Sequence, residues 1–265
     1  MSDIMDIKFT RCKWEDIHSF VQNHIKEYRI TVDSYWEGFA LYSNHYLMIY
    51  GNEAAGYFAI NRGDTIALFN VFPFYAAHAQ ELFARVKKYE QVTNAIVATG
   101  DELFLSHCLD SFARIEKEMY MSIFTEKDML RRRCIRLRPA DYKNDSDIEM
   151  IKLSGEFFSG IVKQIEEGKV PHMKVYIAED NGELVGFGCH DLGRVVDEIA
   201  SIGMFVCESK REQGYGSSIL RGMKDIVNEM GYKAYAACDY FNHNSKKSME
   251  SAGAYTKSRL VRFYF

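Results

Sequence analysis

The segment that follows the apolar run at residues 199–207 has the residue types of an anion-binding loop. It contains Arg211, Gly214 and Gly216, and Ser217 follows the second glycine. Two glycines at alternate positions let successive backbone N–H groups converge, because neither carries a side chain that blocks the approach. The helix expected after the loop adds its unpaired N-terminal donors and the positive end of its dipole. The pattern therefore predicts a phosphate-binding site, with Arg211 anchoring the loop or contacting the anion.

Two other nucleotide-binding loops fit this segment less well. A Walker loop needs Gly-Lys followed by Ser or Thr, and that sequence is missing here. A dinucleotide-binding fingerprint is closer, because Gly214 and Gly216 open a helix and Asp239 ends the next strand. Ile219 replaces the third small residue of that fingerprint, and a polar stretch separates the strand from the first glycine. An NAD(P)-dependent oxidoreductase therefore remains an alternative function.

The helix that positions this loop is predicted by an apolar pattern with a period of about 3.6 residues. The residues on its buried face are Ile219, Leu220, Met223, Ile226, Val227 and Met230. Gly231 follows at the position of a left-handed C-cap, and residues 233–238 are expected to form the next strand. The alternation of hairpin, helix and strand predicts a mixed α/β sheet.

The two halves of the chain repeat this order of elements, which indicates two diverged copies of one fold. Hairpins are expected at residues 46–60 and 175–188, with turns at 51–53 and 180–182. Apolar runs, amphipathic helices and further strands follow each hairpin; Leu82, Phe83, Val86 and Tyr89 mark the helix of the first half. The charged stretch at residues 125–133 predicts a boundary, with domains at 1–128 and 134–265.

The sequence from Arg211 to Gly216 resembles the Arg/Gln-x-x-Gly-x-Gly/Ala loop of the GNAT superfamily of N-acetyltransferases, which holds the pyrophosphate of acetyl-CoA. Residues 242–245 and 250–254 resemble the family's Asn-x-x-Ser and Glu-x-x-Gly-Phe segments. The resemblance covers roughly Val175 to the C-terminus. After Val71 the first half lacks both the glycines and the arginine. The resemblance thus implies two GNAT-like domains in tandem, of which the first is degenerate and binds no CoA.

The resemblance also implies which residues bind acetyl-CoA. In the family the fourth strand separates from the fifth and its backbone contacts the pantetheine arm, although the apolar residues at this place are equally compatible with an ordinary core. The implied cofactor-binding residues are Met204, Phe205 and Val206 on the strand; Arg211, Glu212, Gln213, Gly214, Tyr215, Gly216 and Ser217 at the diphosphate; and Asn242, Ser245 and Met249 after the fifth strand. Lys246 and Lys247 are candidates for the third phosphate.

The reaction implied is direct transfer of acetyl to a primary amine, which needs a base and an acid. Glu198 begins the fourth strand, where family members often place a carboxylate, so we expect it to act as the base. The family's usual acid is a tyrosine, but Met249 occupies its position and a thioether cannot donate a proton. Tyr240 is our candidate acid; Tyr255, Cys238 or a water are the alternatives.

Several histidines, aromatic residues and cysteines are expected to have structural roles rather than catalytic or metal-binding ones. His24 is expected in the core, His190 at the cleft or at a strand end, and Tyr35, Trp36, Phe39 and Tyr42 on the buried face of a helix. The six cysteines are scattered, so we expect reduced thiols, and the spacing of the histidines predicts no metal site.

Composition limits the functional classes. The chain has 265 residues, of which 47% are hydrophobic, and a formal charge of -4, which favours a globular protein without a nucleic-acid partner. An acidic N-terminal start and the lack of a long apolar run predict a cytoplasmic chain without a membrane partner. We expect a monomeric or homodimeric acetyltransferase acting on a small-molecule or peptide amine. A non-catalytic acyl-CoA-binding regulatory module is the second alternative.

Overall fold

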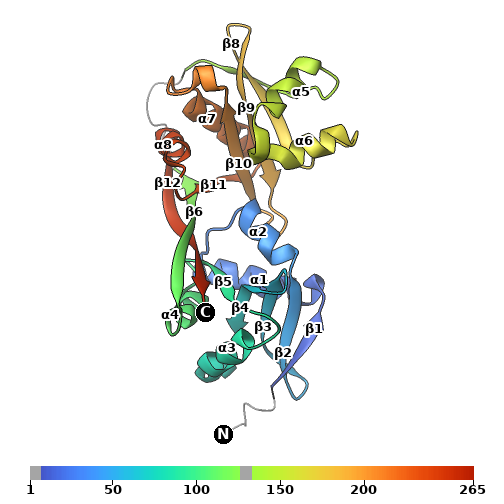
Figure 1. Cartoon of the computed structure of the whole chain (residues 1–265), viewed down its shortest axis with the longest axis vertical. Helices are drawn as coiled ribbons and strands as arrows, with labels where there is room; N and C mark the ends of the chain where they lie inside the picture. Colours follow the sequence, from blue (N-terminus) through green and yellow to red (C-terminus); the bar gives the residue numbers. More distant parts are fainter. Residues whose placement is uncertain (1–6, 126–132) are drawn as a thin grey trace. The chain divides into compact units, whose positions relative to one another are not determined.

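The computed structural model describes residues 7–125 and 133–265 (Figure 1). Contacts divide the chain into two compact units, one formed by Met1–Tyr120 with Ser258–Phe265 and the other by Met121–Lys257. The boundary expected at residues 125–133 falls mostly on 126–132, which lie outside the described residues. In each unit helices pack on a mixed sheet, so the predicted α/β class is confirmed.

The first unit has a sheet with the strand order β1-β2-β3-β4-β5-β12. Its elements are β1 (Lys8–Cys12), α1 (Trp14–Tyr28), α2 (Ser34–Leu41), β2 (Asn44–Tyr50), β3 (Glu53–Asn61), β4 (Thr65–Val71), the 3-10 helix η2 (Pro73–His78), α3 (Ala79–Lys87), β5 (Asn94–Ala98), α4 (Glu102–Leu109), the first part of β6 (Arg114–Phe124) and the last part of β12 (Ala254–Tyr264). Strand β12 pairs antiparallel with β5, from Leu260 opposite Ala98 to Tyr264 opposite Asn94. The end of the chain therefore completes the sheet of the first unit, whereas we expected it in the second domain.

Aromatic side chains fill the core of the first unit. Phe58 and Phe69 from the sheet pack with Phe83 of α3 and Phe104 of α4. His24 is buried, as predicted. The prediction of a fully buried α2 face is wrong for Tyr35 and Tyr42, which are 42% and 71% exposed, because α2 is short and Tyr42 lies just beyond its last residue.

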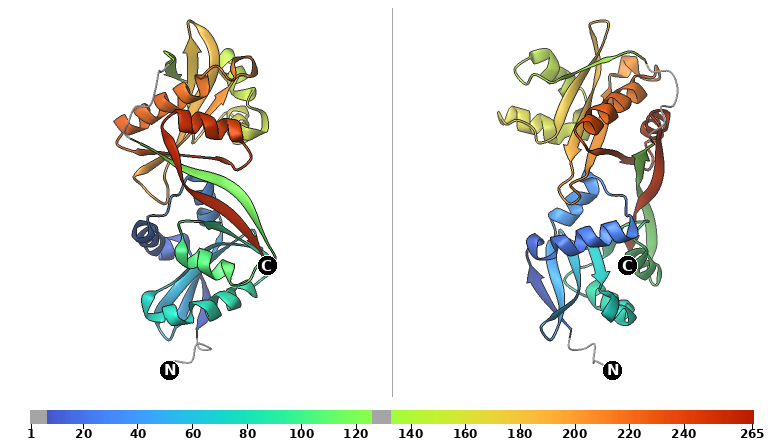
Figure 2. Two further views of the ribbon diagram at one scale, coloured as in Figure 1. Left: turned by 90° about the vertical axis from the view of Figure 1, so that its left-hand side faces the viewer. Right: turned by 180° about the vertical axis from the view of Figure 1, so that it is seen from behind.

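The second unit has the strand order β6-β11-β10-β9-β8-β7. Its elements are the last part of β6, then β7 (Arg136–Pro139), α5 (Asp145–Lys152), η3 (Gly155–Phe158), α6 (Ser159–Glu166), β8 (Lys174–Asp180), β9 (Glu183–Leu192), β10 (Ile199–Val206), η4 (Glu208–Lys210), α7 (Tyr215–Glu229), β11 (Lys233–Asp239), α8 (His243–Ser251) and the first part of β12. Helix α7 packs on one face of the sheet, and α5 and α6 pack on the other (Figures 1 and 2).

Residues with positive φ mark several ends of these helices and strands. The turn between β8 and β9 has positive φ at Asn181 (51°) and Gly182 (84°), as the sequence predicts for a tight hairpin. Gly231 has a φ of 89° and follows Met230, the C-cap residue of α7, which confirms the predicted left-handed glycine at this helix end. Helix α5 is followed by the 3-10 turn η3, which begins at Gly155 with a φ of 60°.

A partly buried ion pair joins β7 of the second unit to α5. Arg138 on β7 donates two hydrogen bonds, of 2.6 and 2.7 Å, to the carboxylate of Asp147 on α5. These bonds hold the pKa of Asp147 below its usual value, against the opposing effect of burial. Arg138 also donates to Glu179 on β8 at 2.6 Å. The network therefore fixes α5 against two strands.

All six cysteines are free thiols in the structure. Within residues 7–125 and 133–265, no helix is both long and apolar enough to cross a membrane. The same residues contain no group of three or more His, Cys, Asp or Glu side chains that could hold a metal ion.

Candidate functional site

Two parallel strands of the second unit separate along their length. Strand β10 pairs with β9 from Ala200 to Val206. Its parallel pairing with β11 extends only from Ile199 to Ser201, opposite Lys233 to Tyr235, although β11 continues to Asp239. The strands therefore diverge after Ser201 and open a gap toward their carboxyl ends. Such a gap presents main-chain groups of β10 that no longer pair with β11.

The loop after β10 has the backbone conformation of an anion-binding loop. Glu212 has a φ of 61° and Gly214 a φ of 85°, and Gly214 is the N-cap of α7. The N–H groups of the first turn of α7 have no partners within the helix and point out of its N-terminus, where the dipole is positive. Ser217 donates its hydroxyl hydrogen to the Gly214 carbonyl at 2.9 Å, which fixes this turn.

The two glycines of the loop are needed for different reasons. Gly214 adopts a left-handed conformation that other residues adopt only with strain. Gly216 lies in ordinary helix, but a Cβ there would come within 3.0 Å of Ser248 Oγ and 3.3 Å of Met204 Cε. Gly216 thus allows α8 and β10 to approach the start of α7 closely.

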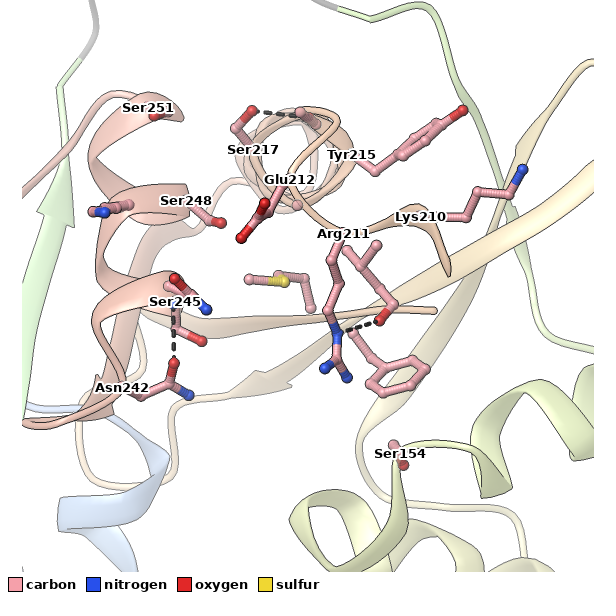
Figure 3. Close-up of a pocket in the computed structure, with 17 residues that line it drawn as sticks. Ser154, Lys210, Arg211, Glu212, Tyr215, Ser217, Asn242, Ser245, Ser248 and Ser251 are labelled. Carbon is pink, nitrogen blue, oxygen red and sulfur yellow. Dashed lines mark hydrogen bonds between the residues drawn. The ribbon is translucent and has the colours of Figure 1, made fainter. Parts of the chain in front are cut away.

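The gap and the loop form one cavity of about 510 Å³ in the second unit (Figure 3). The residues that line it are Ser154, Met204, Phe205, Val206, Lys210, Arg211, Glu212, Gly214, Tyr215, Gly216, Ser217, Asn242, Asn244, Ser245, Lys247, Ser248 and Ser251. In Figure 3, Ser245 and Ser248 project from α8 on the side that faces the start of α7. The cavity therefore has a polar wall of hydroxyl groups opposite the helix N-terminus and an apolar floor from β10.

Charges at the cavity have mixed sign. Arg211 donates from Nε to the Val206 carbonyl at 3.4 Å, so the side chain spans the loop, and Figure 3 shows its other nitrogens directed away from the loop. Lys210 is bound to Glu183 at 2.7 Å, and this bond raises the pKa of Lys210. Lys247 adds a further positive charge on α8, while the exposed carboxylate of Glu212 opposes anion binding.

A cluster of polar contacts around Tyr215 holds the loop in place. Tyr215 donates its hydroxyl hydrogen to Asp180 at 2.7 Å, and Arg133 Nε lies 3.3 Å from the same carboxylate oxygen. Arg133 also donates to the Gln213 carbonyl at 3.0 Å, and its backbone N–H donates to Ser218 Oγ at 3.2 Å. Arg133 belongs to the charged run to which the sequence analysis assigned only a boundary. The structure shows that this residue supports the loop.

The structure brings together the predicted cofactor-binding residues at this cavity, except Gln213 and Met249. Gln213 turns back to bond the Ser209 carbonyl at 3.1 Å, and Met249 is only 3% exposed in the packing of α8. Lining residues that the sequence analysis missed are Ser154, Lys210, Asn244, Ser248 and Ser251. The spacing of Ser245, Ser248 and Ser251 along one helix face was a signal for part of this set. Ser154 had no signal, because it enters from a distant segment.

The two predicted catalytic residues do not line the cavity. Glu198 precedes β10, its side chain is 68% exposed, and it lies 3.3 Å from Lys233 Nζ in a surface ion pair. Tyr240 follows β11 and packs edge-on against Phe241. Among the alternative acids, Cys238 is buried, which raises its pKa to about 11, and Tyr255 is half exposed on β12. The roles of Glu198 and Tyr240 stay predictions.

The corresponding strands of the first unit also diverge, but the surrounding residues differ. Strands β4 and β5 pair only at Thr65 and Ile66. The next residues form η2, and no residue from Phe72 to Ala79 has a positive φ. Helix α1 contacts both sides of this region, through the Phe20 ring near Phe72 and a 3.1 Å contact from His24 to Asp101, the N-cap of α4.

Comparisons with known proteins agree with this geometry. Residues 13–125 match the "Acetyltransferase (GNAT) domain" family and residues 136–254 match the "Acetyltransferase (GNAT) family". The chain therefore belongs to the GNAT acetyltransferase superfamily and carries two such domains in tandem. No curated protein matches the sequence.

Three solved structures share the fold over nearly the whole chain. A GNAT-family acetyltransferase from Colwellia psychrerythraea has 18% identity and a TM-score of 0.82, covering 97% of this chain and 99% of its own. A GCN5-related N-acetyltransferase from Sphaerobacter thermophilus has 14% identity and a TM-score of 0.66, with coverage of 97% and 95%. A tandem GNAT protein from the clavulanic acid biosynthesis pathway has 12% identity and a TM-score of 0.59, with coverage of 97% of each chain.

Proposed function

We propose that the second unit binds acetyl-CoA in the cavity between β10, α7 and α8 and transfers the acetyl group to a primary amine. The observation that carries this proposal is the separation of β10 from β11 directly before a loop whose left-handed Gly214 opens α7. The amides after Gly214 fit a diphosphate, and the gap between the strands fits an extended arm that bonds to main chain.

Each wall of the cavity has a role in this proposal. The first turn of α7 and Arg211 bind the diphosphate, while Met204 to Val206 contact the pantetheine arm. Asn242 caps α8 by accepting a hydrogen bond from the Ser245 N–H at 3.1 Å, which leaves its amide group for a ligand. When bound, acetyl-CoA supplies an activated acetyl thioester. The chain orients it for attack by the amine.

We further propose that the first unit binds no CoA. Its η2 segment lacks the left-handed residues of the loop, and α1 is linked to the start of α4 by His24 and Asp101. The domain at residues 1–128 would then serve as a scaffold, and each chain would bind one acetyl-CoA.

Ligand-dependent stability tests the proposed function. A ligand at a hundredfold excess over its Kd stabilises the folded state by about 2.7 kcal/mol. Acetyl-CoA should raise the melting temperature, and NADH should not. The reverse result would favour an NAD(P)-dependent oxidoreductase. Thiol release from acetyl-CoA across a panel of primary amines then separates a transferase from a regulatory module that binds without turnover.

A further inference from the structure

Three polar side chains form a row across the sheet of the second unit. Asp191 on β9 is directly opposite Ser201 on β10, and Ser201 is in turn paired with Tyr235 on β11. Paired residues on neighbouring strands share a face of the sheet, at a strand spacing of about 4.8 Å. The row therefore presents a carboxylate, a hydroxyl and a phenol on one face.

This row lies where the gap between β10 and β11 closes, because Ser201 and Tyr235 are their last pair. If the diphosphate binds at Gly214, an arm that extends along the gap has its distal end near the row. The length of β10 from Val206 back to Ser201 is roughly 16 Å at about 3.3 Å per residue. An arm as long as this stretch of β10 would place its reactive end beside these three residues.

The row occupies the face of the sheet opposite α7. A Cβ at Gly188 would collide with Met223 of α7, so the side chains that alternate with Gly188 point the other way. Asp191 belongs to this second set with Phe187 and Cys189, which pack in the core under α5 and α6. Phe205 of the cavity shares that face, because it is paired with Phe187. Phe205 of the cavity and the row therefore lie on the same face of the sheet, with Gly203 between Phe205 and Ser201 on β10.

The environment of Asp191 suits a cation. The residue is 7% exposed, and His172 Nε2 lies 3.8 Å from its Oδ2. The backbone N–H of His172 donates to Gln164 Oε1 on α6 at 3.2 Å, so the imidazole is positioned from a second element. A carboxylate removed from water gains more from an ammonium group than an exposed one does.

The phenol of Tyr235 is the proton-bearing group of the row. Burial, the largest effect, raises the pKa of its phenol, so the hydroxyl keeps its proton at neutral pH. Lys233 opposes this shift, whereas Glu198 and Tyr255 add to it. Glu198 and Lys233 thus act on the row from the strand ends, without lining the cavity.

From this arrangement we infer that Asp191, Ser201 and Tyr235 form the acceptor end of the site and select a cationic primary amine. The inference rests on the proposed function. Asp191 binds the ammonium group and takes one proton from it, and the neutral nitrogen attacks the thioester carbon. As the C–N bond forms and the C–S bond breaks, Tyr235 gives its proton to the thiolate. The new amide nitrogen releases its second proton to solvent, and one proton passes from Asp191 to the phenolate, so both groups are restored.

A crystal structure of the full chain with coenzyme A tests the placement. We expect the coenzyme sulfur within about 5 Å of Tyr235 Oη and on the Asp191 face of β10. A bound coenzyme A with its sulfur on the α7 face or near Tyr240 would overturn the inference and leave the proposed function intact. Failure of coenzyme A to bind in calorimetry would instead reject the proposed function.

Amide and phenylalanine variants test the chemistry, with acetyl-CoA, a panel of linear diamines and a weakly basic aromatic amine that is uncharged at pH 7 as probes. Asp191→Asn should lower kcat/KM for the amine at least tenfold, and Tyr235→Phe should lower kcat at least tenfold and change its pH profile at high pH. The Kd for coenzyme A should stay within twofold in both. Matched controls are Glu149→Gln on the exposed side of α5 and Tyr232→Phe before β11, which should keep the wild-type rates.

The same variants also show which outcomes would contradict a role for the row in the reaction. If Asp191→Asn lowered the rates for cationic and uncharged amines equally, Asp191 would not select charge. Wild-type rates in both row variants, with coenzyme A binding preserved, would remove the row from the reaction. A variant that fails to fold is recognised by its melting curve, and Asp191→Glu, which keeps the charge, then provides the kinetic comparison.

Discussion

The guanidinium carbon of Arg133 lies 4.3 Å from the centre of the Tyr215 ring. Tyr215 is the first residue of α7, and its hydroxyl is bonded to Asp180 on β8. Arg133 contacts the same aspartate and the Gln213 carbonyl. The loop that we assign to the diphosphate is therefore held from outside the cavity by a residue more than seventy positions earlier in the sequence. A site built from main-chain amides needs such support, because the direction of each N–H donor is set by the backbone of the loop and cannot be corrected by a change of side-chain conformation.

Removing this support should weaken coenzyme A binding. For Arg133→Met we expect the Kd to rise about fivefold to thirtyfold, since a partly exposed cation–π contact and one hydrogen bond are together worth roughly 1–2 kcal/mol. Calorimetry with coenzyme A and dephospho-coenzyme A provides the measurement. Equal losses for both ligands support an effect on the loop, and a loss confined to coenzyme A would mean that Arg133 contacts the third phosphate. Arg136→Met, at a side chain that is 76% exposed, is the control.

The carboxylate of Glu212 should oppose the ligand. It lines the cavity beside the predicted diphosphate site, and like charges repel even where solvent weakens the effect. Glu212→Gln should lower the Kd for coenzyme A roughly twofold to fivefold, with a larger gain at low salt. An unchanged or weaker affinity at low ionic strength would show that the anion does not bind at this loop.

Gly214 should be required for both the loop and its ligand. Gly214→Ala forces a side chain into the left-handed region, which costs about 1–2 kcal/mol of unfolding free energy and changes the direction of the helix-starting amides. We expect at least a tenfold rise in the Kd for coenzyme A. Gly160→Ala is the matched control, since that glycine in α6 has no positive φ and nothing lies within 4 Å of an added Cβ. Equal effects of the two substitutions on binding would contradict the account.

The Arg138–Asp147 pair should make stability depend on acid pH. The pKa of Asp147 is lower in the folded state than in the unfolded chain, so its stabilising effect is complete above the unfolded pKa of about 3.9 and is lost as pH falls below it. Asp147→Asn should cost about 2–3 kcal/mol at pH 7 and less at pH 3. Chemical denaturation at several pH values checks this, and a pH-independent loss would argue against the ion pair as the cause.

Much of the candidate site could be predicted from the sequence, because its geometry depends on residues with positive φ. Gly214 and Gly231 mark left-handed positions at the two ends of α7, and both are visible in the sequence. The catalytic residues could not be placed in this way. The place of Glu198 at the start of the expected fourth strand suggested a base, but the strand begins only after it, and its side chain pairs with Lys233 at the surface.

Residues that reach the cavity or its loop from distant parts of the chain could not be predicted, because no local sequence pattern marks them. Ser154 reaches the cavity from the end of α5, and Arg133 reaches the loop from the charged run near the boundary. The row of Asp191, Ser201 and Tyr235 depends on strand register, which a single sequence does not reveal. The exchange of the C-terminal strand into the first unit was missed for the same reason, since pairing partners far apart in the sequence leave no periodic signal.

Calorimetric titration of the wild-type chain and Gly214→Ala with acetyl-CoA tests the central claim most directly. We predict one binding site per wild-type chain and at least tenfold weaker binding in the variant, while both proteins show cooperative melting. No binding to the wild type, two equivalent sites, or equal affinity in both proteins would contradict a single acetyl-CoA site at the start of α7.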